Sequence, residues 1–112
     1  MKVAIIGSRE FDNFDITPYI PKETTEIISG GAVGVDTVAK EYALAHNIKY
    51  TEFLPEYNTH GRVAPLIRNL SIVRSADHVI AFWNGESNGT KFVIEHCQKY
   101  AIPLSIFMPK EK

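Results

Sequence analysis

The sequence predicts an α/β fold, a three-layer sandwich in which helices cover both faces of a five-stranded, mostly parallel sheet. Two observations lead to this prediction. Short apolar segments alternate along the chain with longer segments whose apolar residues recur at the period of a helix. The short segments are also almost entirely apolar, as expected of strands that are buried on both faces. The predicted strands are 3–6, 26–29, 49–53, 79–83 and 104–107.

The first strand is followed by a small, cationic turn of Gly7, Ser8 and Arg9. The guanidinium of Arg9 is planar and permanently charged, which suits phosphate or carboxylate. An ion pair with a neighbouring acidic residue is the structural alternative. The next segment, 12–21, predicts one or two helical turns, and its two prolines limit their length.

The second strand runs into a glycine-rich turn and then into an amphipathic helix. Glycines allow positive φ, and unpaired amides at a helix start attract anions, so the turn predicts a phosphate site. It matches neither G-x-G-x-x-G nor G-x-x-x-x-G-K-[ST], and a purely geometric role for the glycines is the alternative. Asp36 fits a ribose contact or helix capping equally well. The candidate binding residues of this region are Ser29, Gly30, Gly31, Ala32, Gly34 and Asp36.

An irregular loop at 54–61 and a predicted helix at 62–76 precede the fourth strand. Tyr57 and His60 of the loop either cover a nucleobase or sugar, or belong to an ordinary surface loop. In the helix, Arg68 projects away from the apolar arc and is available for a ligand or for solvent. Its neighbour Asn69 fits a base or ribose contact or a loop brace. The apolar arc consists of Val63, Leu66, Ile67, Leu70 and Val73.

A third small-residue turn, at 83–90, leads into the last helix, which is expected to bury Val93, Ile94, Cys97 and Ala101. The hydroxyls of this turn either cap the helix or bind phosphate. In an open parallel sheet all such turns meet at one edge, where ligands bind. We therefore expect one crevice to be lined by Gly7, Ser8, Arg9, Gly30, Gly31, Arg68, Asn69, Ser87, Gly89 and Thr90.

Composition limits the remaining possibilities. The 112 residues predict one domain, 1–112, with a net charge of -1 that gives no global attraction to polyanions. The single cysteine, Cys97, rules out an internal disulfide and fits a cytoplasmic protein. The four histidines show no metal-ligand spacing, so no metal and no cofactor are expected. No apolar run is long enough for a membrane span.

Six segments, 7–9, 29–36, 68–69, 76–77, 79–83 and 89–90, together resemble the SLOG superfamily. This superfamily includes the DprA DNA-processing proteins, the Lonely Guy (LOG) phosphoribohydrolases and small YpsA-like proteins. The matching segments span nearly the whole chain, and they look most like the small YpsA-like members. The resemblance implies a Rossmann-like fold and binding of a nucleotide or nucleotide-derived ligand.

Three functions follow from the residues and the resemblance. The first is a sensor or binding module for a nucleotide-like molecule. The second is LOG-like hydrolysis of nucleoside 5′-monophosphates by Arg68 with Glu95 or Glu86, although the glutamate that LOG enzymes place after Gly-Thr is missing. The third, DNA processing by analogy with DprA, conflicts with the absence of a basic groove and of a row of aromatic residues. The sequence therefore favours a nucleotide ligand, predicts no nucleic-acid partner, and leaves self-association open.

Overall fold

A computed structural model describes residues 1–31 and 34–109 of the chain. The strands, whose bounds close this paragraph, form one sheet in the order β3-β2-β1-β4-β5. Every pair of neighbouring strands in this sheet runs parallel. The predicted α/β, Rossmann-like fold is confirmed, with every neighbouring strand pair parallel rather than most of them. The strands are β1 (Lys2–Gly7), β2 (Glu26–Ser29), β3 (Lys49–Glu52), β4 (His78–Phe82) and β5 (Leu104–Phe107).

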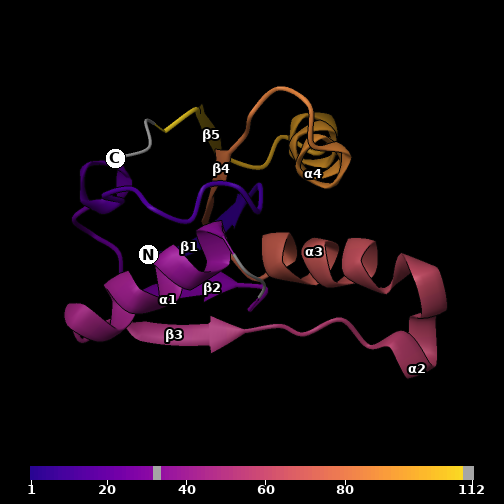
Figure 1. Ribbon diagram of the computed structural model, residues 1–112, viewed down its shortest axis with the longest axis horizontal. Helices are drawn as coiled ribbons and strands as arrows, with labels where there is room; N and C mark the ends of the chain where they lie inside the picture. The colour runs from indigo at the N-terminus through magenta and orange to yellow at the C-terminus, as the bar shows by residue number, and fades with distance from the viewer. Residues whose placement is uncertain (32–33, 110–112) are drawn as a thin grey trace.

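Helices cover both faces of this sheet (Figure 1). Helix α1 (Val35–Ala45) contacts β1, β2 and β3, while α3 (Ala64–Arg74) and α4 (Asn88–Lys99) lie together. The remaining helical turns are η1 (Thr17–Tyr19), α2 (Tyr57–His60) and η2 (Gly61–Val63). In the part of the chain that the structure describes, no helix has the length and apolar character to span a membrane.

Alternate residues of the central strands pack into two separate cores, one on each face. On one face Val3 and Ile5 of β1 pack with Val35 of α1 and with Phe14. On the other face Ala4 and Ile6 pack with residues of α3 and α4, including Ile72, Val73, Val93 and Cys97. Because successive side chains of a strand point to opposite faces, this division follows directly from the apolar run 3–6.

Three details of the predicted helices are wrong. The helix expected at 62–76 is divided into η2 and α3, and Val63, expected to be buried, is 50% exposed. The buried residues of α3 are Ala64, Ile72 and Val73. The division of the helix into a 3-10 turn and α3 changes which side chains face the sheet. Ala101, also expected to be buried, is exposed, and it lies just beyond the end of α4 with a φ of 54°.

The strand order places a crevice at the centre of the molecule. The chain runs from β1 outward to β2 and β3, then crosses to β4 on the other side of β1. Ligands of open α/β sheets bind at the carboxyl ends of the strands where the order reverses in this way. Gly7, at the end of β1, packs closely there, since a Cβ would lie 2.5 Å from Val35 Cγ2 and 2.9 Å from the Phe82 carbonyl oxygen.

Candidate functional site

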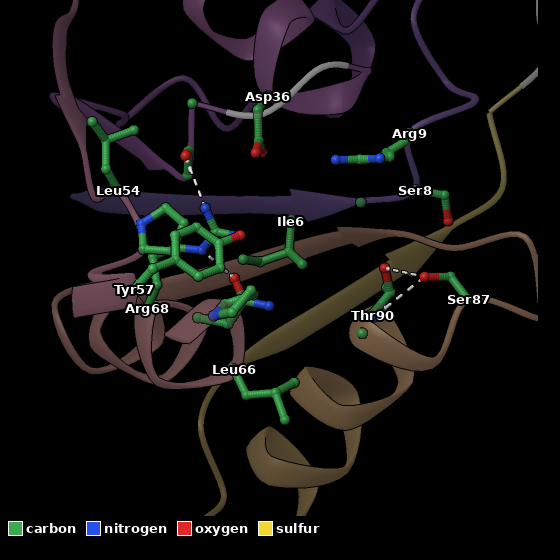
Figure 2. Close-up of a pocket in the computed structure, with 17 residues that line it drawn as sticks. Ile6, Ser8, Arg9, Asp36, Leu54, Tyr57, Leu66, Arg68, Ser87 and Thr90 are labelled. Carbon is green, nitrogen blue, oxygen red and sulfur yellow. Dashed lines mark hydrogen bonds between the residues drawn. The ribbon is translucent and has the colours of Figure 1, made fainter. Parts of the chain in front are cut away.

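A cavity of about 470 Å³ opens at this crevice (Figure 2). It is bordered by the ends of β1 and β2, the start of α1, the loop after β3, α3 and the start of α4. Its lining consists of Ile6, Gly7, Ser8, Arg9, Gly30, Gly31, Asp36, Leu54, Pro55, Tyr57, Pro65, Leu66, Arg68, Asn69, Ser87, Gly89 and Thr90. The small-residue turns predicted to share one edge therefore do lie around one cavity.

The guanidinium of Arg68 lies directly over the glycine turn after β2. Its Nη1 donates a hydrogen bond to the Gly30 carbonyl oxygen at 2.9 Å, and its Nε donates to Asn69 Oδ1 at 2.8 Å. A Cβ on Gly30 would collide with the guanidinium, so the close approach requires glycine at this position. No bond from Nη2 is found to any residue that the structure describes, which leaves this part of the fork available to an anion.

The same turn requires two further glycines for a different reason. Gly31 has a φ of 70° and Gly34 a φ of 84°, values that other L-residues rarely adopt. Gly34 also precedes α1, and a Cβ there would collide with the main chain of Arg9. The turns after β1 and β2 are thus packed backbone against backbone, which fixes Arg9 relative to the start of α1.

Behind the glycine turn, Ser29 is fully buried and bonded within the protein. Its Oγ lies 2.6 Å from the Tyr50 hydroxyl oxygen, and Tyr50 donates to Glu52 Oε1 at 3.4 Å. Burial is the largest cause that raises the pKa of Tyr50 to about 12. Ser29 does not line the cavity, so it supports the turn instead of facing a ligand.

On the opposite side of the cavity, α4 begins with its own cap. Ser87 is the N-cap residue, and its Oγ accepts a long hydrogen bond of 3.5 Å from the Thr90 amide. The two hydroxyl oxygens lie 3.3 Å apart, and the Ser87 carbonyl accepts a bond from Trp83 Nε1 at 3.0 Å. Of the two roles left open for these hydroxyls, capping is therefore present for Ser87.

Ser8 has a buried hydroxyl with no hydrogen-bond partner among the residues that the structure describes. The residue is only 5% exposed and lines the cavity. In Figure 2 its oxygen points to the side of the cavity that holds Ser87 and Thr90. Buried polar groups are nearly always hydrogen-bonded, so this hydroxyl is a donor at the cavity for which the described residues provide no acceptor.

The structure brings together most of the binding residues predicted from the sequence. Gly34 packs on Arg9 and Ser29 lies behind the turn, so neither lines the cavity. Ala32 falls outside the described residues. Glu86 and Glu95 are exposed and do not line the cavity, so neither carboxylate lies beside Arg68. The predicted residues that do line it are Gly7, Ser8, Arg9, Gly30, Gly31, Asp36, Arg68, Asn69, Ser87, Gly89 and Thr90.

Apart from Tyr57, the apolar part of the lining was not predicted from the sequence. Leu54 and Tyr57 are 61% and 60% exposed, although both side chains are large and largely apolar. The signal in the sequence for an apolar wall was an irregular loop that contains large apolar residues, of which only Tyr57 was considered as a cover for a base or sugar. The remaining missed residues are Ile6, Pro55, Pro65 and Leu66.

The charges of the cavity are mainly those of Arg9, Arg68 and Asp36. Arg9 is exposed, and Arg68 is partly buried. Within 1–31 and 34–109, no three His, Cys, Asp or Glu side chains gather closely enough to hold a metal ion. The cavity can therefore attract an anion at its guanidinium groups and contact an apolar group at its loop side.

Comparison with known proteins identifies relatives of this chain. Residues 1–65 match the sequence model of the family "DNA recombination-mediator protein A". The Gene 61 protein of Mycobacterium phage D29 is 33% identical over 90 residues, which cover 75% of this chain and 72% of that protein.

A solved structure has the same fold. DNA processing protein A from Helicobacter pylori, reported for its single-stranded DNA binding mode, matches 95% of this chain with a TM-score of 0.68 and 24% identity. The matched region covers 64% of that structure's chain, so this chain is similar to one part of a longer protein.

These matches contradict two expectations. A nucleotide sensor and a LOG-like phosphoribohydrolase were predicted, but the family and the solved neighbour are those of DNA-processing proteins. The expectation that nucleic acid is not a partner is wrong on the same findings. Its physical basis was the net charge of -1 together with the lack of a basic groove and of a row of aromatic residues. The net charge averages over the whole chain and gives no weight to the two arginines, Arg9 and Arg68, that line one cavity. The resemblance to DprA-type SLOG proteins is confirmed, and the chain belongs to the family of DNA recombination-mediator protein A.

Proposed function

We propose that this protein binds single-stranded DNA in the cavity at the carboxyl ends of β1 and β2, as part of DNA processing. The observation that carries the proposal is the Arg68 guanidinium, which is fixed over Gly30 at the point where the strand order reverses. Family membership supports a DNA-processing role, and the single-stranded DNA binding of the Helicobacter pylori protein supports the choice of ligand.

The cavity offers several groups to a phosphodiester. Arg68 is already oriented by two hydrogen bonds, so little side-chain entropy is lost when it binds an anion. Arg9 adds a second guanidinium, and the N-terminus of α4 directs its dipole toward the same cavity. The unpaired Ser8 hydroxyl is able to donate to a phosphate oxygen.

The shape and composition of the cavity favour a single strand over a duplex. A concave volume of about 470 Å³ lies in the range of sites that enclose one small molecule, such as one nucleotide unit. Bases of a duplex are stacked and paired inside the helix, whereas an unpaired strand can place a base against an apolar wall. Leu54, Tyr57 and Leu66 supply such a wall.

We also propose that the protein is located in the cytoplasm, on the ground that its proposed ligand is single-stranded DNA.

The proposal is tested by the affinity of a fluorescently labelled oligo-dT, measured by anisotropy over a series of salt concentrations. Arg68→Ala is expected to weaken binding by about tenfold or more, the loss typical of a hydrogen bond to a charged group. It should also flatten the dependence of log K on log salt by about 0.7, since one phosphate contact is lost. Arg68→Lys, which keeps the charge without the planar fork, should fall between wild type and alanine.

Arg74→Ala is the matched control, because Arg74 is an exposed arginine at the end of the same helix and does not line the cavity. It should change the affinity by less than about twofold, as expected for a surface charge. Equal effects of the two substitutions would show that general charge, and not the cavity, governs binding. Equal or tighter binding of the corresponding duplex would contradict the preference for a single strand.

A further inference from the structure

Tyr57 belongs to two neighbouring cavities. It lines the first cavity, beside Arg68, and also a second one of about 500 Å³ formed by residues 55–59. Pro55 is the other residue that the two cavities share. Figure 2 shows Tyr57 on the same side of the first cavity as Arg68 and Leu54, away from Ser8, Ser87 and Thr90. Tyr57 therefore lies at the boundary between the two cavities.

The ring of Tyr57 is unusually available for contact. The residue is 60% exposed, and among the described residues no aromatic, cation or hydrogen-bond contact to its side chain is found. Tyr57 is also the first residue of the short helix α2, so its main chain is held while the side chain extends from it. An aromatic ring with exposed faces offers a stacking surface to any nucleobase, whatever its sequence.

The two cavities differ in charge, and this difference indicates how a strand lies. Two guanidinium groups, those of Arg9 and Arg68, and one carboxylate, that of Asp36, line the first cavity, so positive charge predominates there. The lining of the second includes Glu56 and no lysine or arginine. A phosphodiester is attracted to the first and repelled by the carboxylate of the second, whereas a neutral base is accepted by either.

We propose that Tyr57 is the base-stacking residue of this site, at the boundary between the first cavity, which holds the phosphate, and the second, toward which the base extends. This inference rests on the proposed single-stranded DNA binding and adds the residue that contacts the base. Arg68 holds a phosphate in the first cavity, and the adjacent base stacks on the Tyr57 ring. Because stacking tolerates every base, the contact adds affinity without sequence preference.

The experiment compares two ligands, an oligo-dT and an abasic strand of the same length, which carries the same phosphates without bases. Tyr57→Ala is expected to weaken binding of oligo-dT by about thirtyfold, the middle of the range for one lost base stack, and to leave the abasic strand within about twofold. Tyr57→Phe, which keeps the ring, should bind both ligands like the wild type. Thermal melting of each variant verifies that the fold is retained.

Tyr100→Ala is the matched control. Tyr100 is 59% exposed, nearly the same as Tyr57, but it follows α4 and lines neither cavity. It should leave both affinities unchanged within about twofold. Equal losses for Tyr57→Ala on oligo-dT and on the abasic strand would overturn the stacking role, as would an oligo-dT affinity like that of Tyr100→Ala. In both cases the proposed function stands if the wild type binds the strands. Absence of oligo-dT binding by the wild type would overturn the proposed function as well.

Discussion

The turns that follow β2 and β4 both contain glycines and both border the cavity, yet they are built differently. In the turn after β2, Gly30 lies under the Arg68 guanidinium, and Gly31 and Gly34 have positive φ. In the turn after β4, Gly85 also has a positive φ, but a Cβ on Gly85 or Gly89 would meet no atom within 4 Å. The first turn is closely packed, whereas the second has open space around its glycines.

The N-termini of the helices that follow these two turns, α1 and α4, also differ. Gly34 at the start of α1 provides no side-chain cap. Ser87 at the start of α4 provides a cap through its own hydroxyl. Two turns of similar amino-acid composition are therefore stabilised in different ways. One turn is fixed by contacts with Arg9 and Arg68, and the other is a self-capped helix end.

The largest effect is expected from Gly34→Ala. A Cβ at this position collides with the Arg9 main chain, and a φ of 84° with a ψ of -128° is essentially restricted to glycine. We expect a loss of about 3 kcal/mol or more in the free energy of unfolding and a Tm lower by about 10 °C or more. Thermal denaturation followed by circular dichroism measures both. A Tm within a few degrees of the wild type would show that the two turns are not rigidly packed.

An intermediate effect is expected from Gly30→Ala, and it concerns binding more than stability. The added Cβ collides with the guanidinium, the far end of a flexible side chain, so Arg68 can move away at little cost in folding free energy. Displacing the arginine should weaken oligo-dT binding about as much as Arg68→Ala, about tenfold. The double variant Gly30→Ala/Arg68→Ala should then bind no more weakly than either single variant. Additive losses would mean that Gly30 acts independently of the arginine.

The smallest effects are expected at the second turn. Ser87→Ala removes the α4 cap and should cost about 0.5–1 kcal/mol, at the low end of such losses because the capping bond is long. Gly89→Ala, in open space within the first turn of α4, should instead raise stability by about 0.5–1 kcal/mol. Chemical denaturation with a common m-value resolves changes of this size. A destabilising Gly89→Ala would indicate that this turn is as constrained as the one after β2.

How much of the site could be predicted from the sequence depends on whether a feature is local or joins residues far apart in the chain. Gly31 and Gly34 were recognisable because positive φ and a helix start leave a local signal in the sequence. Ser29 was assigned to the cavity, but its hydrogen bond to Tyr50 on the neighbouring strand draws it behind the turn. That bond joins residues 21 positions apart, and no pattern within either strand reveals it. The apolar wall at Leu54 and Leu66 was missed for the same reason, since it is assembled from a loop and a helix.

The sequence by itself determined the parallel α/β sheet, its small-residue turns and the cationic residues beside them, because strand and helix periods and glycine conformations are local properties. Only the tertiary structure decided that Arg68 lies over Gly30, that the Ser8 hydroxyl is left without a partner, and that Tyr57 stands between two cavities. These features depend on how α3 and the loop after β3 pack against the sheet edge. Such packing is a balance of contacts between residues far apart in the chain, which the order of residues does not display.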